Sequence, residues 1–163
     1  MTPVPLSAGP GQESVWDYPR PPRVEPTTER VVVTLDGHPV ALTTEAVRVL
    51  ETSHPPVYYL PFDAFEAGVL EAAVGSSACE FKGIADYLSV RAGGRLLSRV
   101  GWTYPTPLPG YEILADRVAL YADELTCTVD GEQVQPQAGG FYGGWITSRV
   151  VGPFKGSPGT RGW

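Results

Sequence analysis

Residues 79–86 bring three reactive types of side chain close together in the sequence. Cys79 carries a thiol, Lys82 an amine and Asp86 a carboxylate. An ammonium held near a thiol favours the thiolate, which is the form that nucleophilic and redox cysteine chemistry needs. We therefore consider Cys79, Lys82 and Asp86 as candidate catalytic residues, with the carboxylate of Asp86 orienting the lysine.

The path of the backbone determines whether these side chains can meet. Successive side chains of a strand point to opposite faces, so Cys79 and Lys82 approach each other only if the chain bends at Gly83 or at residues 75–77, which are predicted to form a turn. The alternative is that Cys79 is a buried structural thiol and that Lys82 and Asp86 belong to a solvated, ion-paired surface. The sequence is compatible with both interpretations.

Aromatic residues provide the second group of candidates. The chain has four Trp, eight Tyr and five Phe, and several of them flank Pro or Gly, where loops open. Such rings line apolar ligand pockets and cages for cations, or they pack the two ends of the chain onto the rest of the protein. We expect a ligand-binding pocket to be formed by Tyr59, Tyr87, Trp102, Tyr104, Tyr142 and Trp145.

The remaining Cys and His residues are interpreted as structural. Cys127 alternates with Val and Leu in a predicted hairpin and is expected in the core. His38 lies in a predicted edge strand. His54 has the residue type of a general base, but no recognisable motif places a nucleophile beside it, so we assign it to a loop before Pro55 and Pro56.

Two short sequences occur twice. Trp-x-Tyr-Pro is found at 16–19 and 102–105, and Phe-Lys-Gly at 81–83 and 154–156. The spacing between the two copies differs from one sequence to the other, which argues against an internal duplication. We interpret each as a short sequence that forms a similar local structure at two unrelated places in the chain.

Hairpins are the elements expected to position the candidate residues. Three pairs of β-rich segments surround the turn sequences Asp36-Gly37, Gly93-Gly94 and Asp130-Gly131. Pro39 lacks an amide donor, which predicts that its strand lies at the edge of a sheet. The predicted strands cover residues 30–35, 38–42, 57–60, 84–91, 95–102, 118–121, 124–129 and 132–135, and residues 43–50 are predicted to form a turn followed by a strand.

The composition favours turns and short strands over long helices. The 163 residues include 17 Pro and 19 Gly, fewer than in a disordered chain of low complexity. Brief helical segments are predicted only at 63–68, with Asp63 as N-cap, and at 111–115. The chain is expected to consist of a Pro-rich N-terminal arm (1–29), a β domain (30–138) and a Gly- and aromatic-rich tail (139–163) that packs on the domain without regular structure.

Charge and cysteine content limit the expected partners and cofactors. Twelve Lys and Arg against 18 Asp and Glu give a net charge of −6, and the basic residues are scattered, so nucleic acid and anionic membranes are poor partners. Neither Cys79 nor Cys127 belongs to a C-x-x-C pair, and we expect no metal or other cofactor. The first residues lack the pattern of an export signal, and no apolar run is long enough to span a membrane. We expect a cytoplasmic protein that is a monomer or a homodimer.

Several motifs together resemble a known family. They are Glu-Ser-Val-Trp-Asp-Tyr-Pro-Arg-Pro-Pro (13–22), Tyr-Tyr-Leu-Pro (58–61), Cys-Glu-Phe-Lys-Gly-Ile-Ala-Asp-Tyr (79–87) and Trp-Thr-Tyr-Pro (102–105). Over nearly its whole length the chain is similar to domain-of-unknown-function family 427. Its tail motifs, Phe-Tyr-Gly-Gly-Trp-Ile-Thr (141–147) and Gly-Pro-Phe-Lys-Gly (152–156), look like the version found in actinobacterial, and thus bacterial, members.

The resemblance implies a mainly β fold, a β-tent-like arrangement of coiled antiparallel sheets with one or two short helices. Some β-tents carry zinc between two C-x-x-C knuckles. This chain lacks the knuckles, so hairpins are expected to clamp the tent instead. The family is sometimes labelled a nucleotidyltransferase domain, but the sequence has neither a Gly-rich phosphate cradle before a helix nor a carboxylate pair suited to magnesium.

These observations lead to two expectations of function. The first is a small-molecule-binding domain with an aromatic-walled pocket, a polar end formed by Lys82 and Cys79 for an acidic or carbonyl-bearing ligand, and a lid formed by the tail around Tyr142 and Trp145. The alternative is a cofactor-free enzyme that uses Cys79 as a nucleophile or Lys82 as an amine or general acid. The absence of a Gly-x-Ser-x-Gly or His-Glu-x-x-His motif favours the first.

Overall fold

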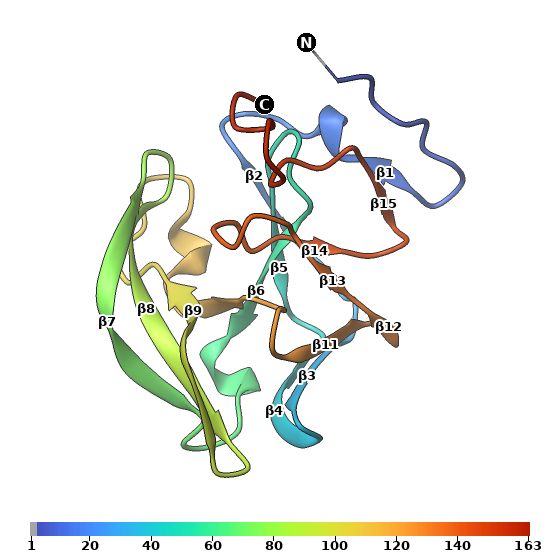
Figure 1. The fold of residues 1–163 in the computed structure, drawn as a ribbon. Helices are drawn as coiled ribbons and strands as arrows, with labels where there is room; N and C mark the ends of the chain where they lie inside the picture. Colours follow the sequence, from blue (N-terminus) through green and yellow to red (C-terminus); the bar gives the residue numbers. More distant parts are fainter. Residues whose placement is uncertain (1–2) are drawn as a thin grey trace.

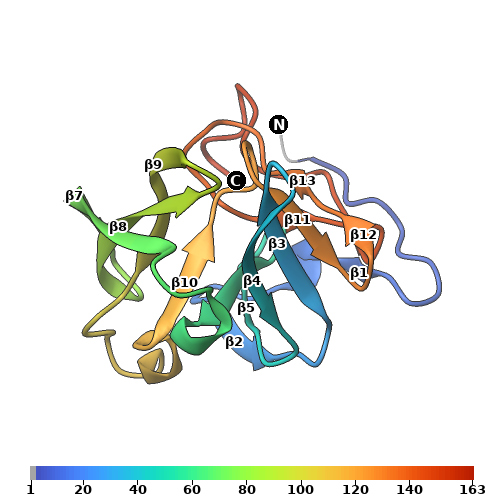
Figure 2. The same ribbon diagram turned by 90° about the horizontal axis from the view of Figure 1, so that it is seen from below.

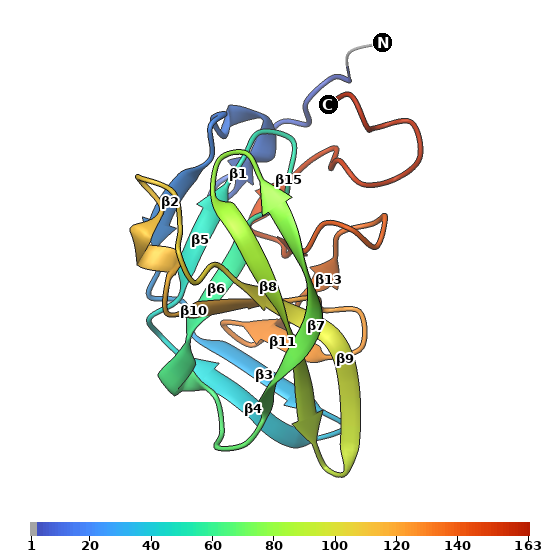
Figure 3. The same cartoon turned by 90° about the vertical axis from the view of Figure 1, so that its left-hand side faces the viewer.

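A curved, seven-stranded antiparallel sheet is the largest element of the computed structural model, which describes residues 3–163. At one end of this sheet the last three strands arch along the side of the molecule (Figure 1). The long hairpin formed by β7 (Leu70–Cys79) and β8 (Gly83–Ala92) is seen from its outer side in Figure 3. The strands lie in the order β2 (Arg23–Pro26), β5 (Val47–Leu50), β6 (Val57–Pro61), β10 (Arg117–Leu120), β9 (Arg95–Thr103), β8 (Gly83–Ala92) and β7 (Leu70–Cys79).

A second, four-stranded sheet is built from the two predicted Asp-Gly hairpins. The strands of the first hairpin lie beside those of the second (Figure 2). Asp36 and Gly37 have φ values of 50° and 82°, and Asp130 and Gly131 have 50° and 83°, the left-handed pair that a two-residue hairpin turn needs. The strands lie in the order β12 (Glu132–Gln133), β11 (Thr126–Val129), β3 (Val31–Leu35) and β4 (His38–Thr43). The edge position of β4, predicted from Pro39, is confirmed.

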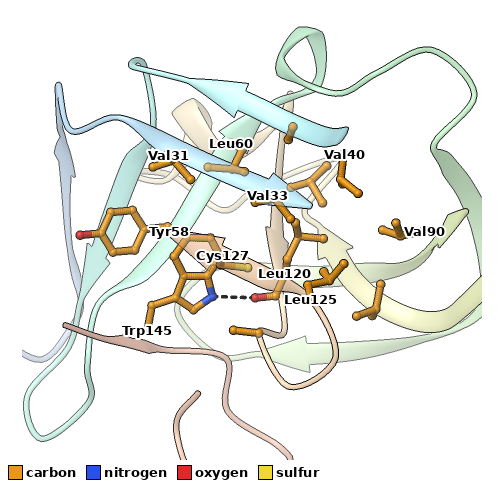
Figure 4. Packing of buried hydrophobic residues seen from close by; sticks show 14 of the residues in the cluster. Val31, Val33, Val40, Tyr58, Leu60, Val90, Leu120, Leu125, Cys127 and Trp145 are labelled. Carbon is orange, nitrogen blue, oxygen red and sulfur yellow. Dashed lines mark hydrogen bonds between the residues drawn. The ribbon is translucent and has the colours of Figure 1, made fainter. Parts of the chain in front are cut away.

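The main core lies between the two sheets and is largely aliphatic. Alternate residues of β3 enter it, and Val31, Val33 and Leu35 are fully buried. Cys127 lies in this core as predicted, and burial raises the pKa of its thiol to about 12. Figure 4 shows the packing around Trp145, whose indole N–H donates to the carbonyl oxygen of Leu120 at 2.9 Å.

The N-terminal arm is held by short elements and by ion pairs. Strand β1 (Glu13–Ser14) pairs in parallel with β15 (Val150–Val151) and continues into the 3-10 helix η1 (Val15–Asp17). Val15 is fully buried, and the Trp16 indole donates to the carbonyl oxygen of Pro153 at 2.8 Å. Contacts with the C-terminal part of the chain thus cover the apolar patch of the arm.

The C-terminal tail contains regular structure, so the expectation of a tail without it was wrong. Besides β15, strand β14 (Trp145–Ile146) pairs with β13 (Gln135–Pro136). The amide of Trp145 also donates to the carbonyl oxygen of Pro56 at 2.8 Å. Buried backbone groups need partners, and pairing with the domain provides them.

Two local predictions need correction. Residues 75–77 do not form a turn: β7 continues to Cys79, and Gly75, with φ at +107°, lies where the β7–β8 register shifts. The predicted helix at 63–68 is shorter, because η2 covers only Phe62–Ala64 and has no side-chain N-cap. The helical turn near residue 112 is confirmed as η3 (Glu112–Leu114).

The mainly β architecture with coiled antiparallel sheets and short helices is therefore confirmed. In residues 3–163 no helix has the length and apolar character needed to cross a membrane. Within the same residues no three His, Cys, Asp or Glu side chains gather as a metal site would require.

Candidate functional site

A cavity of about 280 Å³ opens on the face of the seven-stranded sheet opposite the main core. Neighbouring residues of one strand show how the two faces differ: Tyr58 on β6 packs in the main core, whereas the next residue, Tyr59, lines the cavity. Strands β5 to β9 supply one side of the lining, and residues 137–155 of the C-terminal part of the chain supply the other.

Three rings, Tyr59, Trp102 and Tyr104, form what we call the aromatic wall. The Trp102 indole N–H donates to the Tyr59 hydroxyl at 3.1 Å, and the centroid of the Tyr59 ring lies 6.5 Å from that of Trp102 and 6.3 Å from that of Tyr104. Burial raises the pKa of Tyr59 and of Tyr104 above the usual value. Both hydroxyls therefore stay protonated well above neutral pH.

The predicted meeting of Cys79 and Lys82 is present. Cys79 is the last residue of β7 and pairs with Gly83, the first residue of β8. The turn between them brings Lys82 back over the strand end, and its ammonium donates to the Cys79 sulfur at 3.1 Å. The turn is held from outside, because the amide of Leu108 donates to the Lys82 carbonyl oxygen at 2.9 Å. The required bend thus follows Cys79 instead of preceding it.

Two sequence-predicted site residues lie elsewhere. Asp86 is exposed and does not line the cavity. Side chains of β8 alternate between the two faces of the sheet, and after the turn it is Ala85 and Tyr87 that point to the cavity face. It therefore does not orient Lys82. Trp145 is almost fully buried in the main core, where its ring stacks on Tyr58 with centroids 5.2 Å apart. We leave Asp86 and Trp145 out of the site.

Tyr87 and Tyr142 do line the cavity, and Tyr142 marks a second polar end that we did not predict from the sequence. There the His54 ring stands edge-on to Tyr142, with centroids 4.9 Å apart, and its Nε2 lies 3.9 Å from a carboxylate oxygen of Glu51. The Lys155 ammonium lies 5.5 Å from the centroid of the Tyr142 ring. This second end therefore combines an imidazole, a carboxylate and an ammonium.

Gln137 determines which nitrogen of His54 carries the proton. Its side-chain oxygen accepts from the amide of Gly144 at 3.0 Å, and its nitrogen donates to the carbonyl oxygen of Lys155 at 2.7 Å. The same nitrogen lies 3.1 Å from His54 Nδ1. An amide nitrogen only donates, so Nδ1 must accept and Nε2 must hold the proton of the neutral ring.

His54 is neutral at neutral pH. Burial and the positive charges of Lys155, Arg20 and Lys82 outweigh the opposing effect of Glu51 and lower the pKa of His54 to about 4. The cavity thus presents an uncharged N–H donor at this end.

Two glycines allow the C-terminal part of the chain to lie directly on the aromatic wall. A Cβ on Gly143 would overlap the ring of Trp102, and one on Gly144 would lie 2.6 Å from Pro55. The Tyr121 hydroxyl donates to the carbonyl oxygen of Phe141 at 2.9 Å, which fixes the approach of this segment. We call residues 141–144 the rim segment, because they border the cavity at Phe141, Tyr142 and Gly143.

A signal for the second polar end was present in the sequence. The two Phe-Lys-Gly copies place Lys82 and Lys155 on the same cavity, although their flanking segments are far apart in the chain. His54, Glu51 and Gln137 carry no comparable pattern, because they reach the cavity only through the tertiary packing of loops.

Comparison with protein families gives a match over most of the chain. A family described as "Domain of unknown function (DUF427)" matches residues 23–135. The matched region contains the aromatic wall, Cys79, Lys82 and His54, whereas Gln137, the rim segment and Lys155 lie beyond it. A comparison with curated proteins found no match.

Proposed function

This chain belongs to the family described as a domain of unknown function (DUF427), and from the geometry of its cavity we propose that it binds a small organic anion or carbonyl compound with a planar body. The role is the one expected from the sequence, a small-molecule-binding domain, in a cytoplasmic bacterial protein. The alternative expectation, an enzyme, uses the same cavity and is considered below.

The charge of the lining carries this proposal. Lys82 and Lys155 each bring an ammonium to the cavity, and the carboxylate of Glu51 is already paired with Arg20 at 2.9 Å. The whole chain, by contrast, has a net charge of −6. A locally positive cavity in an acidic protein favours an anionic or electron-rich ligand over a cation.

The size and the walls of the cavity limit the body of the ligand. A volume of about 280 Å³ is at the lower end of ligand pockets, which span roughly 300–1,000 Å³. The aromatic wall on one side and Tyr142 on the other suit a flat ring that stacks or packs edge-on. A single-ring carboxylate or carbonyl compound satisfies both conditions.

The test uses benzoate as the probe and benzylamine as a control of similar shape and opposite charge. We expect benzoate to quench the fluorescence of Trp102, assigned by comparison with Trp102→Phe, and benzylamine to have no effect. Lys82→Met should weaken benzoate binding roughly tenfold through loss of a charge-assisted contact. Arg161→Met, an exposed charge that does not line this cavity, is the matched control. Equal binding of both probes would contradict the proposal.

One observation favours an enzyme as the second candidate: the hydrogen bond between Lys82 and Cys79 at 3.1 Å. This arrangement pairs a nucleophile with a proton donor, as covalent catalysis requires. The two candidates differ in turnover. A binding domain consumes at most one equivalent of a reactive probe, whereas an enzyme converts many equivalents. If Cys79 is the nucleophile of an enzyme, Cys79→Ala should abolish the consumption of the probe.

A further inference from the structure

The Cys79–Lys82 pair places two nucleophilic atoms, a sulfur and a nitrogen, 3.1 Å apart at the cavity. At hydrogen-bond distance both atoms can bond to the same carbon. We propose that this pair captures aldehydes covalently, as a thioaminal in which one carbon bridges the Cys79 sulfur and the Lys82 nitrogen. The inference rests on the proposed function, because the cavity must first admit a carbonyl compound.

Both atoms are available for this reaction. Within residues 3–163 the Cys79 sulfur is the sole hydrogen-bond partner of the Lys82 ammonium, which makes no ion pair there. Lys155 differs, because its ammonium donates to the backbone carbonyl oxygen of Trp163 at 3.2 Å. Cys127 also differs, because it is buried in the main core. Among residues 3–163, Cys79 and Lys82 are therefore the thiol and the amine that both line the cavity and lie within hydrogen-bond distance of each other.

The surroundings keep the pair in place and accommodate the rest of the aldehyde. The turn that carries Lys82 is fixed by the amide of Leu108, and the ammonium lies 5.7 Å from the centroid of the Tyr104 ring. The aldehyde substituent can then lie along the aromatic wall. A fixed pair beside an apolar surface favours bridging over single, reversible addition, because less freedom is lost when the second bond forms.

The reaction balances without a further reactant. It starts from the thiolate and ammonium form of the pair, which holds the same protons as thiol and amine. The Cys79 thiolate attacks the carbonyl carbon, and the Lys82 ammonium gives one proton to the carbonyl oxygen, which yields a hemithioacetal and a free amine. The amine then attacks the same carbon, the hydroxyl leaves with the amine proton as water, and a neutral N–C–S bridge results.

The experiment compares 4-formylbenzoate, which can react, with benzoate, which cannot. Native mass spectrometry should show that the wild-type chain gains the mass of one aldehyde less one water. Cys79→Ala and Lys82→Arg should each abolish this gain, and Lys82→Arg keeps the positive charge needed to bind the probe. Cys127→Ala, which removes the other thiol, should retain the gain. Thermal unfolding of each variant confirms that it is folded.

The outcomes separate this inference from the proposed function. Benzoate quenching without an aldehyde adduct would overturn the capture but leave anion binding in place. An adduct without benzoate quenching would support capture and contradict anion binding. An adduct of the same mass in Cys79→Ala would be a simple lysine imine and would also overturn the thioaminal. If neither benzoate quenching nor an aldehyde adduct is seen, both anion binding and aldehyde capture are overturned.

Discussion

Arg48 and Lys82 are two cationic side chains that the fold treats in opposite ways. Arg48 is fully buried and forms ion pairs with Glu13 at 3.0 Å and Glu25 at 2.6 Å, and Glu13 in turn accepts from the Tyr18 hydroxyl at 2.6 Å. Lys82 faces the cavity, and its hydrogen-bond partner in the described chain is a thiol. A buried charge that is matched by carboxylates holds segments together, whereas a charge without a carboxylate retains capacity for a ligand.

The two centres share one strand. On β5, Arg48 points to the ion-pair network and the next residue, Val49, lines the cavity. The network joins this strand to β1 and, through the ion pair of Arg149 with Glu13 at 3.2 Å, to the segment before β15. The N-terminal arm is therefore anchored on one face of the strand that supports the cavity on the other.

The largest effect is expected from removing the matched charge. Arg48→Met should lower the free energy of unfolding by about 3 kcal/mol, in the lower part of the range for a broken buried ion pair, since Glu13 and Glu25 keep partial access to water. Urea denaturation measures this. Arg23→Met, which removes an exposed partner of Glu25, should cost less than about 1 kcal/mol. Similar losses in both variants would show that burial does not make Arg48 more important for stability than an exposed arginine.

A pH titration of stability should show the next largest effect. The pKa of His54 falls from 6.5 to about 4 on folding, so between these values the unfolded chain binds the proton more strongly. Stability should therefore decrease as the pH falls from 6.5 to 4.5, by about 2 kcal/mol. His54→Gln should flatten this slope, and His38→Gln, at an exposed position, should not. An unchanged slope in His54→Gln would contradict the assignment of a neutral, buried imidazole.

The Glu13 carboxylate acts in a lower pH window. Burial alone would raise its pKa, but hydrogen bonds from Arg48 and Tyr18 and the nearby charges outweigh it and lower the pKa from 4.5 to about 2. Its contribution is fully present above pH 4.5 and is lost as the pH falls toward 2. The slope that Glu13 contributes therefore lies mostly below pH 4.5, whereas that of His54 lies mostly above it.

A smaller effect on stability, with a clear effect on binding, is expected from Gly143→Ala. The added methyl group would overlap Trp102, so the rim segment must move away from the aromatic wall at a cost of about 1–2 kcal/mol. Benzoate affinity should fall in the fluorescence titration. Gly162→Ala, where a Cβ meets open space, is the control. Unchanged affinity in Gly143→Ala would show that the rim segment does not shape the binding site.

The most local effect, a shift of one proton on the His54 ring, is expected from Gln137→Glu, which also removes the hydrogen bond to the Lys155 carbonyl oxygen. The carboxylate can still accept from Gly144, but it can no longer donate to His54 Nδ1. The proton of the neutral imidazole should therefore move from Nε2 to Nδ1. Nitrogen-15 NMR of the ring distinguishes the two tautomers. If Nε2 stays protonated in the variant, Gln137 does not fix the tautomer.

Local signals in the sequence were sufficient for much of the fold. The Asp36-Gly37 and Asp130-Gly131 turns, and the Gly93-Gly94 turn between β8 and β9, identify three hairpins because only a few residue types adopt the required backbone conformation. Strand β7 was not predicted, since none of its side chains is fully buried and they show no apolar alternation. Its pairing with β8 defines it, and pairing is a property of two segments together.

The candidate site was predictable at the hairpin but not across the fold. Cys79 and Lys82 are three residues apart, so one turn brings them together. The number of aromatic residues could not show whether a ring points to the main core or to the cavity. For this reason Trp145 was assigned to the pocket, although it lies in the main core. His54 and Lys155 meet through loops, which leave no periodic pattern.

The cavity is lined by strands of the sheet and by the C-terminal part of the chain, and these two parts are synthesised at different times. The ribosome releases the N-terminal part first, so the β7–β8 hairpin with Cys79 and Lys82 emerges before the rim segment and Lys155 exist. A nascent chain that ends before the rim segment therefore lacks Phe141, Tyr142, Gly143 and Lys155 from the lining. The ligand cannot assist early folding and stabilises, by mass action, only a chain that already extends past Lys155.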